Sequence, residues 1–92
     1  MIKSFAEKRT RDLFETGRSR AWNPIARIAV RKLAQIDSAT TLDELNAPPG
    51  NRLEALKGDR RGQHSIRVND RWRVCFRWED DGAYDVEIVD YH

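Results

Sequence analysis

The chain has little of what several large classes of protein require. Its 92 residues include one cysteine, Cys75, which alone can form neither an internal disulfide nor a zinc site. No apolar run is long enough to span a membrane. After Met1 the sequence turns charged within a few positions, which is not the pattern of a secretory signal. These absences favour a cytoplasmic protein without a membrane partner.

Familiar catalytic and cofactor-binding motifs are also scarce. The two histidines, His64 and His92, have no cysteine or histidine partner at metal-ligand spacing. The glycines that follow Lys57 lack the spacing of a phosphate-binding loop, and no Ser–His–Asp arrangement is indicated. A chain of this length forms one modest core, so we expect a single domain over residues 1–92. We expect neither a metal ion nor an organic cofactor.

Arginine is abundant and unevenly distributed. It supplies 13 of the 17 positive side chains, although the net charge is only +2. Positions 52–77 carry eight positive and three negative side chains, whereas positions 79–92 carry six negative and no positive ones. The planar guanidinium suits phosphate or carboxylate recognition. The pattern therefore fits either two neighbouring strands that neutralise one another or a phosphate site that contains carboxylates.

The period of the hydrophobic pattern changes near residue 50. The helices that we expect are 7–16, 23–38 and, as a short turn, 42–45. Asn23 and Pro24 give the second helix a capping residue and a first-turn proline, and the Pro-Pro-Gly run at 48–50 is expected to end all helical structure. The strands that we expect are 2–5, 53–56, 63–68, 71–78 and 84–90. The order predicts an α+β fold, a small antiparallel sheet with two N-terminal helices packed on one face.

Alternation within the predicted strands separates two faces of this sheet. Val74 and Phe76 point to the apolar face, and Arg73 and Cys75 to the other. Strict alternation puts Asp90 on the apolar face. The face away from the helices is expected to gather Arg67, Arg73, Arg77, Glu87 and Tyr91.

Cleavage of an RNA phosphodiester is the chemistry that such residues support without a cofactor. The 2′-hydroxyl of the substrate is the nucleophile, so the protein supplies a base, an acid and cations for the developing charge. Lys57, at the mouth of a basic loop, and the terminal run Asp90-Tyr91-His92 are suitable residue types. Taken alone, Lys57 equally fits a solvated surface lysine, and His92 equally fits a frayed chain end.

Three blocks of sequence, in order along the chain, carry a specific resemblance. They are 53–60 (LEALKGDR), 65–74 (SIRVNDRWRV) and 90–92 (DYH), and the segments 1–5 and 48–53 match as well. Together they resemble the HigB toxins of the RelE/ParE superfamily, closest to the GraT-like branch, over essentially the whole chain. The resemblance implies a RelE-like fold and a bacterial type II toxin. Its activity would be that of a metal-independent endoribonuclease (mRNA interferase), which cuts ribosome-bound mRNA and inhibits translation and growth.

The same resemblance implies roles for particular residues. Lys57 and Arg73 correspond to contacts with the phosphate and the transition state, and Asp90, Tyr91 and His92 to the proton-transfer and substrate-orienting end. Further RNA contacts are expected from Arg60, Arg61, Arg67 and Arg71. Both Lys57 and Arg73 are expected on the face away from the helices, so replacing either should leave the fold intact.

Two positions depart from the family pattern, and two other functions stay open. Some HigB proteins carry His where this chain has Glu54, and Asn where it has Arg71. A role for position 54 as the general base, and contacts of position 71 with the nucleobases of RNA, therefore stay open. The implied partners are the 70S ribosome with mRNA and a cognate HigA/GraA-like antitoxin with a helix-turn-helix domain. The toxin is expected to contact DNA only indirectly, through this antitoxin. The alternatives are a non-enzymatic ParE-like inhibitor and a nucleic-acid-binding module of the same fold.

Overall fold

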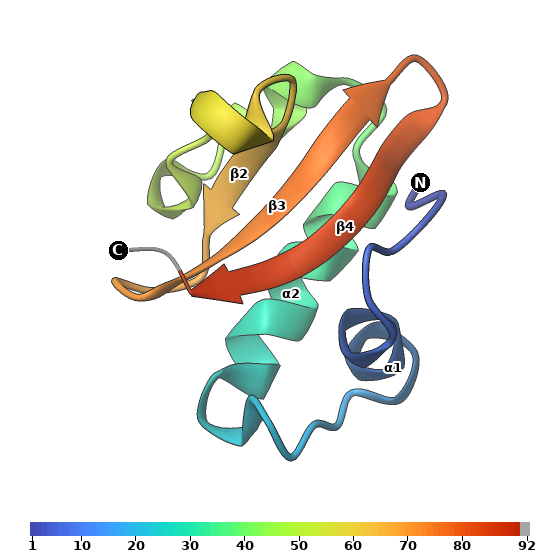
Figure 1. Ribbon diagram of the computed structural model, residues 1–92, viewed down its shortest axis with the longest axis vertical. Helices are drawn as coiled ribbons and strands as arrows, with labels where there is room; N and C mark the ends of the chain where they lie inside the picture. The colour runs from blue at the N-terminus through green and yellow to red at the C-terminus, as the bar shows by residue number, and fades with distance from the viewer. Residues whose placement is uncertain (91–92) are drawn as a thin grey trace.

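The computed structural model describes residues 1–90 as two α-helices, four short 3₁₀ turns and a four-stranded antiparallel sheet. The helices are α1 (Lys8–Thr16) and α2 (Ala26–Ser38). The strands, in sheet order, are β1 (Glu54–Ala55), β2 (His64–Arg67), β3 (Trp72–Glu79) and β4 (Gly82–Asp90). In Figure 1, α2 passes behind the sheet and α1 lies beside β4, so both helices leave free the face that is turned toward the viewer. The expected α+β class is confirmed.

The two helices bury apolar stripes against the sheet. Ala29, Leu33 and Ile36 follow the helical period along α2, and all three are fully buried. Helix α1 contributes Leu13 and ends at Gly17, whose left-handed backbone (φ 74°) lets its N–H donate to the Leu13 carbonyl at 2.8 Å. Truncating a core leucine of this kind costs about 2–5 kcal/mol.

Two expectations about local structure were inexact. Asn23 does not cap α2 but lies in the 3₁₀ turn η1 (Asn23–Ile25), which α2 follows directly. The Pro-Pro-Gly run does not end all helical structure, because Pro49 opens the turn η3 (Pro49–Asn51). Proline is compatible with the first position of a helical turn, where its missing N–H has no partner to lose. The remaining turns are η2 (Leu42–Asn46) and η4 (Gly58–Arg60).

The N-terminal segment pairs with the sheet but does not form the continuous strand that we expected. Ile2 and Phe5 make two isolated parallel bridges, to Ala83 and Val86 of β4. Between the bridges the pairing is interrupted where Asp85 adopts a left-handed conformation (φ 55°) and donates its N–H to the Ser4 hydroxyl at 2.9 Å. A bulge in β4 therefore breaks the first strand into two contacts.

That bulge also sets the faces of β4. The register pairs Cys75 with Glu87 and then Arg77 with Tyr84, so two residues of β4 oppose one residue of β3. As a result Tyr84 and Glu87 lie on the same face although three positions separate them. At the end of the strand Asp90 pairs with Trp72, which puts it on the helix-facing side, as strict alternation predicted.

Candidate active site

A row of polar side chains crosses the sheet on the face that the helices leave free. The pairing registers place Glu54, Ser65, Cys75 and Glu87 side by side, one from each strand. Directly paired residues point to the same face of a sheet. Ser65 and Cys75 are fully buried, so this face is covered at its centre although no helix lies on it.

A cavity of about 530 Å³ opens at the β1 end of this row. Its lining consists of Glu54, Ala55, Leu56, Lys57 and Arg60. Gly58, with φ 64°, makes a sharp reversal after Lys57 and returns the chain as the turn η4. The cavity thus combines an apolar wall with two cations and one carboxylate.

Lys57 is the cation of this cavity that is available to a ligand. Its side chain is exposed, and within residues 1–90 no hydrogen bond or ion pair engages it. A lysine ammonium carries three donors and no acceptor. The rim of the cavity therefore offers an uncommitted positive charge to an incoming anion.

Arg60, also in the cavity wall, reaches across the row. Its Nη1 donates to the Gln63 Oε1 at 3.0 Å and lies 3.5 Å from the Glu87 Oε2 on β4. The thiol of Cys75 lies beneath this contact. Burial raises the pKa of the Cys75 thiol, an effect that the charge of Arg60 opposes and the charge of Glu87 reinforces. The thiol therefore stays protonated at neutral pH and does not act as a nucleophile.

Arg73 lies one step along β3 from this row and is mostly buried, with 8% of its surface exposed. Its Nε donates to the Ser65 hydroxyl at 2.7 Å, and its Nη2 donates to the Arg52 carbonyl at 2.6 Å and the Ser65 carbonyl at 3.3 Å. The guanidinium is thus held in one orientation by two separate segments. This burial changes our expectation that removing Arg73 leaves the fold intact.

Two of the expected site residues, Arg71 and Asp90, pair with each other. The Arg71 Nε and Nη2 lie 2.9 and 2.8 Å from the same Asp90 oxygen, and its guanidinium also stacks 5.0 Å from the centre of the Trp72 ring. The hydrogen bond to Asp90 raises the pKa of Arg71. Arg71 is therefore engaged by Asp90 at the end of β4, and its expected contact with RNA stays a prediction.

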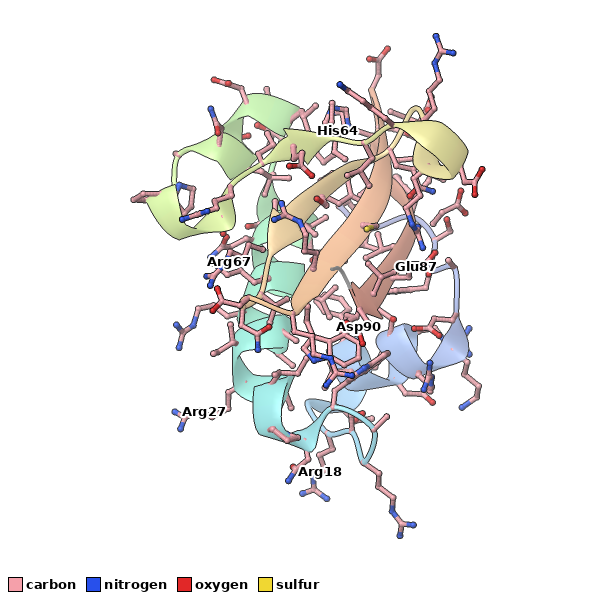
Figure 2. All side chains as sticks on the ribbon, turned by 60° about the vertical axis from the view of Figure 1, so that its left-hand side comes forward. Arg18, Arg27, His64, Arg67, Glu87 and Asp90 are labelled. Atoms are coloured by element: carbon pink, nitrogen blue, oxygen red, sulfur yellow. The ribbon has the colours of Figure 1, made fainter. Side chains whose placement is uncertain are left out.

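The four arginines expected to bind RNA do not form one cluster. Arg60 and Arg61 lie in and after η4, whereas Arg67 and Arg71 lie beyond it at the far end of β2 and the start of β3. Arg67 pairs with the Asp70 carboxylate, while Arg61 is exposed without an ion-pair partner in the described part of the chain. Figure 2 shows Arg67 and Glu87 toward opposite edges of the sheet. The basic residues thus line an extended surface with Arg73 between its ends.

Some site residues lie outside the described structure, and others were missed. Tyr91 and His92, which we expected to be catalytic, lie outside residues 1–90. Ser65, whose hydroxyl accepts a hydrogen bond from Arg73, was not among the residues that we expected in the site. A small hydroxyl residue on the strand next to a central arginine was the available signal.

The described residues contain neither a metal-binding cluster nor a helix that could cross a membrane. Between residues 1 and 90, no group of three or more His, Cys, Asp or Glu side chains is arranged to hold a metal ion. In the same part of the chain, neither helix has the length and apolar character needed to cross a bilayer.

The sequence of this chain matches a family of known proteins along almost its whole length. A family model described as the RelE-like toxin of the type II toxin–antitoxin system HigB matches residues 3–92. The chain belongs to the HigB-like toxin family. Among curated relatives, it is 42% identical over 94 residues to the endoribonuclease HigB of Proteus vulgaris, with both chains fully covered. It is 37% identical over 85 residues to the toxin HigB-1 of Vibrio cholerae, with 90% of each chain covered.

A solved structure supports the fold of this HigB-like chain. The YoeB–YefM complex from Staphylococcus aureus matches with a TM-score of 0.57 over 100% of this chain and 98% of that one, at 16% sequence identity. At such low identity the match concerns the fold, which agrees with the expected RelE-like architecture. The resemblance to HigB toxins is confirmed by the family match, while the GraT-like branch stays a prediction. Membership of a toxin–antitoxin family also implies a cognate antitoxin.

Proposed function

We propose that this HigB-like chain is an endoribonuclease that cuts mRNA on the ribosome and so inhibits translation. The observation that carries the proposal is the cavity beside β1, where the exposed Lys57 stands next to Arg60 and Glu54. An RNA phosphate brings its own nucleophile, the adjacent 2′-hydroxyl, and needs cations and proton-transfer groups around it. The cavity supplies these residue types in one place.

Lys57 and Arg73 are assigned to the phosphate. Within residues 1–90 the Lys57 ammonium at the cavity rim has no partner, and Arg73 is held in one orientation by Ser65 and Arg52. Rigid donors stabilise developing charge with little reorganisation during the reaction. Losing one such donor lowers the rate by about a hundredfold.

The proton-transfer groups are assigned to the end of β4, namely Asp90, Tyr91 and His92. An unperturbed histidine titrates near pH ~6.5 and can serve as base or acid. Asp90 pairs with Arg71, and this contact fits an orienting role for the Asp90 carboxylate. Glu54, the carboxylate of the cavity wall, is another candidate for proton transfer, so Glu54→Gln and His92→Gln belong in the same experiment.

A second basic surface suits the backbone of ribosomal RNA. Arg18 and Arg20 line a concave region of about 680 Å³ between α1 and η1, and Arg27 and Arg31 are exposed on α2. Figure 2 shows Arg18 and Arg27 at the helical end of the molecule. Cations spread over two surfaces give a wide, salt-sensitive footprint on a polyanion.

The remaining partners follow from the same proposal. The cognate antitoxin carries a helix-turn-helix domain, and the toxin reaches DNA only through it. The ribosome presents the mRNA, and the helical basic surface contacts ribosomal RNA. The second candidate function is that of a non-enzymatic inhibitor of the same fold. It ranks below the nuclease because an inhibitor has no need of Lys57 at the rim of a cavity.

Primer extension on a defined mRNA, with and without ribosomes, tests the proposal. We expect new 5′ ends only with ribosomes, and their loss in Lys57→Ala. Lys8→Ala is the matched control, because Lys8 is an exposed lysine on α1 paired with Asp12 at 2.6 Å, and it should cut as the parent does. Growth inhibition without any cleavage would favour the non-enzymatic inhibitor.

The same assay examines the metal requirement. Magnesium is exchanged for cobalt hexammine on ribosomes already assembled on mRNA. Cobalt hexammine keeps the ribosome intact, but its ligands do not exchange, so it cannot coordinate the RNA phosphate directly. We expect cleavage to continue. Loss of cleavage on intact ribosomes would show that a divalent metal takes part in the reaction.

A further inference from the structure

Asn51 is a fully buried polar residue in a surface turn, and all of its side-chain polar groups are satisfied by distant segments. Its Nδ2 donates to the Leu45 carbonyl at 3.0 Å and to the Gln35 Oε1 at 2.9 Å, and its Oδ1 accepts from the Lys32 Nζ at 2.6 Å. Lys32 and Gln35 lie three positions apart on α2, hence on one face of the helix. Asn51 thus ties the turn η3 to that helix.

The residue after Asn51, Arg52, contacts Arg73 of the candidate active site. Arg52 has a left-handed backbone (φ 46°, ψ 56°), which non-glycine residues rarely adopt. Its carbonyl oxygen accepts the 2.6 Å hydrogen bond from the Arg73 Nη2. The direction of that carbonyl depends on the Arg52 dihedral angles, and the anchored Asn51 immediately precedes them. A strained backbone conformation persists when its surroundings hold it in place.

We propose that Asn51, held by Lys32 and Gln35 of α2, is a positioning residue for Arg73, acting through the Arg52 carbonyl. The proposal rests on the proposed function for its catalytic consequence, since Arg73 is there assigned to the RNA phosphate. Asn51 itself does not touch the substrate. It fixes one of the two segments between which the Arg73 guanidinium is held, and Ser65 provides the other.

The state of Lys32 agrees with a dedicated anchor. This lysine is half-buried, and burial, together with the charges of Arg31 and Arg67, lowers its pKa. An ammonium placed among like charges is unfavourable unless a strong acceptor holds it. The Asn51 amide oxygen, at 2.6 Å, is that acceptor.

A double-mutant cycle on the cleavage rate tests the coupling. Single-turnover cleavage on ribosomes is measured for Asn51→Ala, Arg73→Lys and the double variant; Arg73→Lys keeps the charge but not the planar fork. We expect Asn51→Ala to slow cleavage about 10- to 100-fold in the parent, since small displacements of catalytic groups have effects of this size. In the Arg73→Lys background the same change should slow cleavage by less than about twofold. Effects that simply multiply would overturn the proposal.

Two further variants separate positioning from stability. Asn51→Asp keeps the side-chain volume and the acceptor for Lys32, and we expect a cleavage rate between those of the parent and Asn51→Ala. Asp37→Ala removes another contact of α2, the 2.8 Å hydrogen bond from the Ile2 N–H to the Asp37 Oδ1. It should lower thermal stability without changing the rate, and a rate loss equal to that of Asn51→Ala would count against a specific role.

A measurement independent of activity decides the structural part. The Nη–H signals of Arg73, one of which comes from the group that donates to the Arg52 carbonyl, are assigned in ¹⁵N NMR spectra by their loss in Arg73→Lys, and their exchange with water is followed. We expect exchange at least about tenfold faster in Asn51→Ala and unchanged in Asp37→Ala. Unaltered exchange in Asn51→Ala would refute the positioning of Arg73. If the parent cuts no RNA, the proposed function fails while this result still stands.

Discussion

Replacing Arg73 with alanine removes a guanidinium that is 8% exposed and holds two segments of the chain together. The hydrogen bonds to Ser65, at 2.7 and 3.3 Å, and to the Arg52 carbonyl, at 2.6 Å, are lost. The two Ser65 acceptors that remain are buried, and the Arg52 carbonyl is partly buried. Leaving buried groups unsatisfied costs about 1–3 kcal/mol each, and the relief of burying a charge offsets part of this cost.

The expected net loss of folding free energy is about 2–4 kcal/mol. For a domain of this size each kcal/mol lowers Tm by about 4–8 °C, so Arg73→Ala should melt at least about 8 °C below the parent. Thermal unfolding followed by circular dichroism gives this shift. The ribosome cleavage assay, run well below the variant's Tm, gives the accompanying loss of activity.

Lys57→Ala is the matched control for this prediction. Lys57 is exposed and unpaired within residues 1–90, so its removal should change stability by less than about 0.5 kcal/mol. Both variants should lose about a hundredfold in cleavage. An Arg73→Ala protein that melts within about 2 °C of the parent would show that the buried guanidinium contributes nothing to the fold, and would refute the reasoning.

Three further changes have definite expected outcomes. Gly82→Ala places a Cβ 2.2 Å from the Met1 carbonyl oxygen at φ 144°, so urea unfolding should show a loss of about 1–3 kcal/mol, whereas Gly50→Ala, in open space, should be near neutral. Burial raises the pKa of the Cys75 thiol in the folded protein. The protonated thiol therefore contributes its full stability below the pKa of the unfolded thiol, about 8.5, and this contribution is lost as the pH rises through the pKa of the folded thiol. The difference in unfolding free energy between the parent and Cys75→Ala should therefore shrink between pH 7 and pH 10, as measured by urea titration at each pH. Arg71→Ala removes the exposed ion pair at the end of β4. We expect the cleavage rate at saturating ribosome to fall about two- to fivefold while the ribosome Kd stays unchanged. A weaker Kd with an unchanged cleavage rate would instead support a direct contact between Arg71 and RNA.

The faces of the strands could be predicted because alternation is a local property. Val74 and Phe76 are fully buried on the helix side, and Arg73 and Cys75 lie on the other side, as the period of two indicated. The position of Asp90 followed from the same count. Each of these assignments needs only the neighbouring residues and the requirement that one face be covered.

The interior of the candidate site depended on contacts between distant residues. Alternation placed Arg73 on the face without helices, which suggested exposure, yet Arg52 and Ser65 enclose it. The pairing of Arg71 with Asp90 joins residues 19 positions apart, so no local pattern could distinguish it from an RNA contact. Side-chain burial follows from which segments cover a face, and composition does not contain that information.

By itself, the sequence determined the α+β order, the apolar stripes of both helices, the two faces of the sheet and the family. Those features arise from residue periodicity and from motifs that are read along the chain. Only the tertiary structure shows that the N-terminal segment bridges to β4 and that a bulge at Asp85 interrupts this pairing. It also shows that Asn51 accepts a hydrogen bond from Lys32 of α2, and that the next residue, Arg52, accepts one from Arg73. Such features are fixed by hydrogen bonds between residues far apart in sequence, which form only when packing brings their partners together.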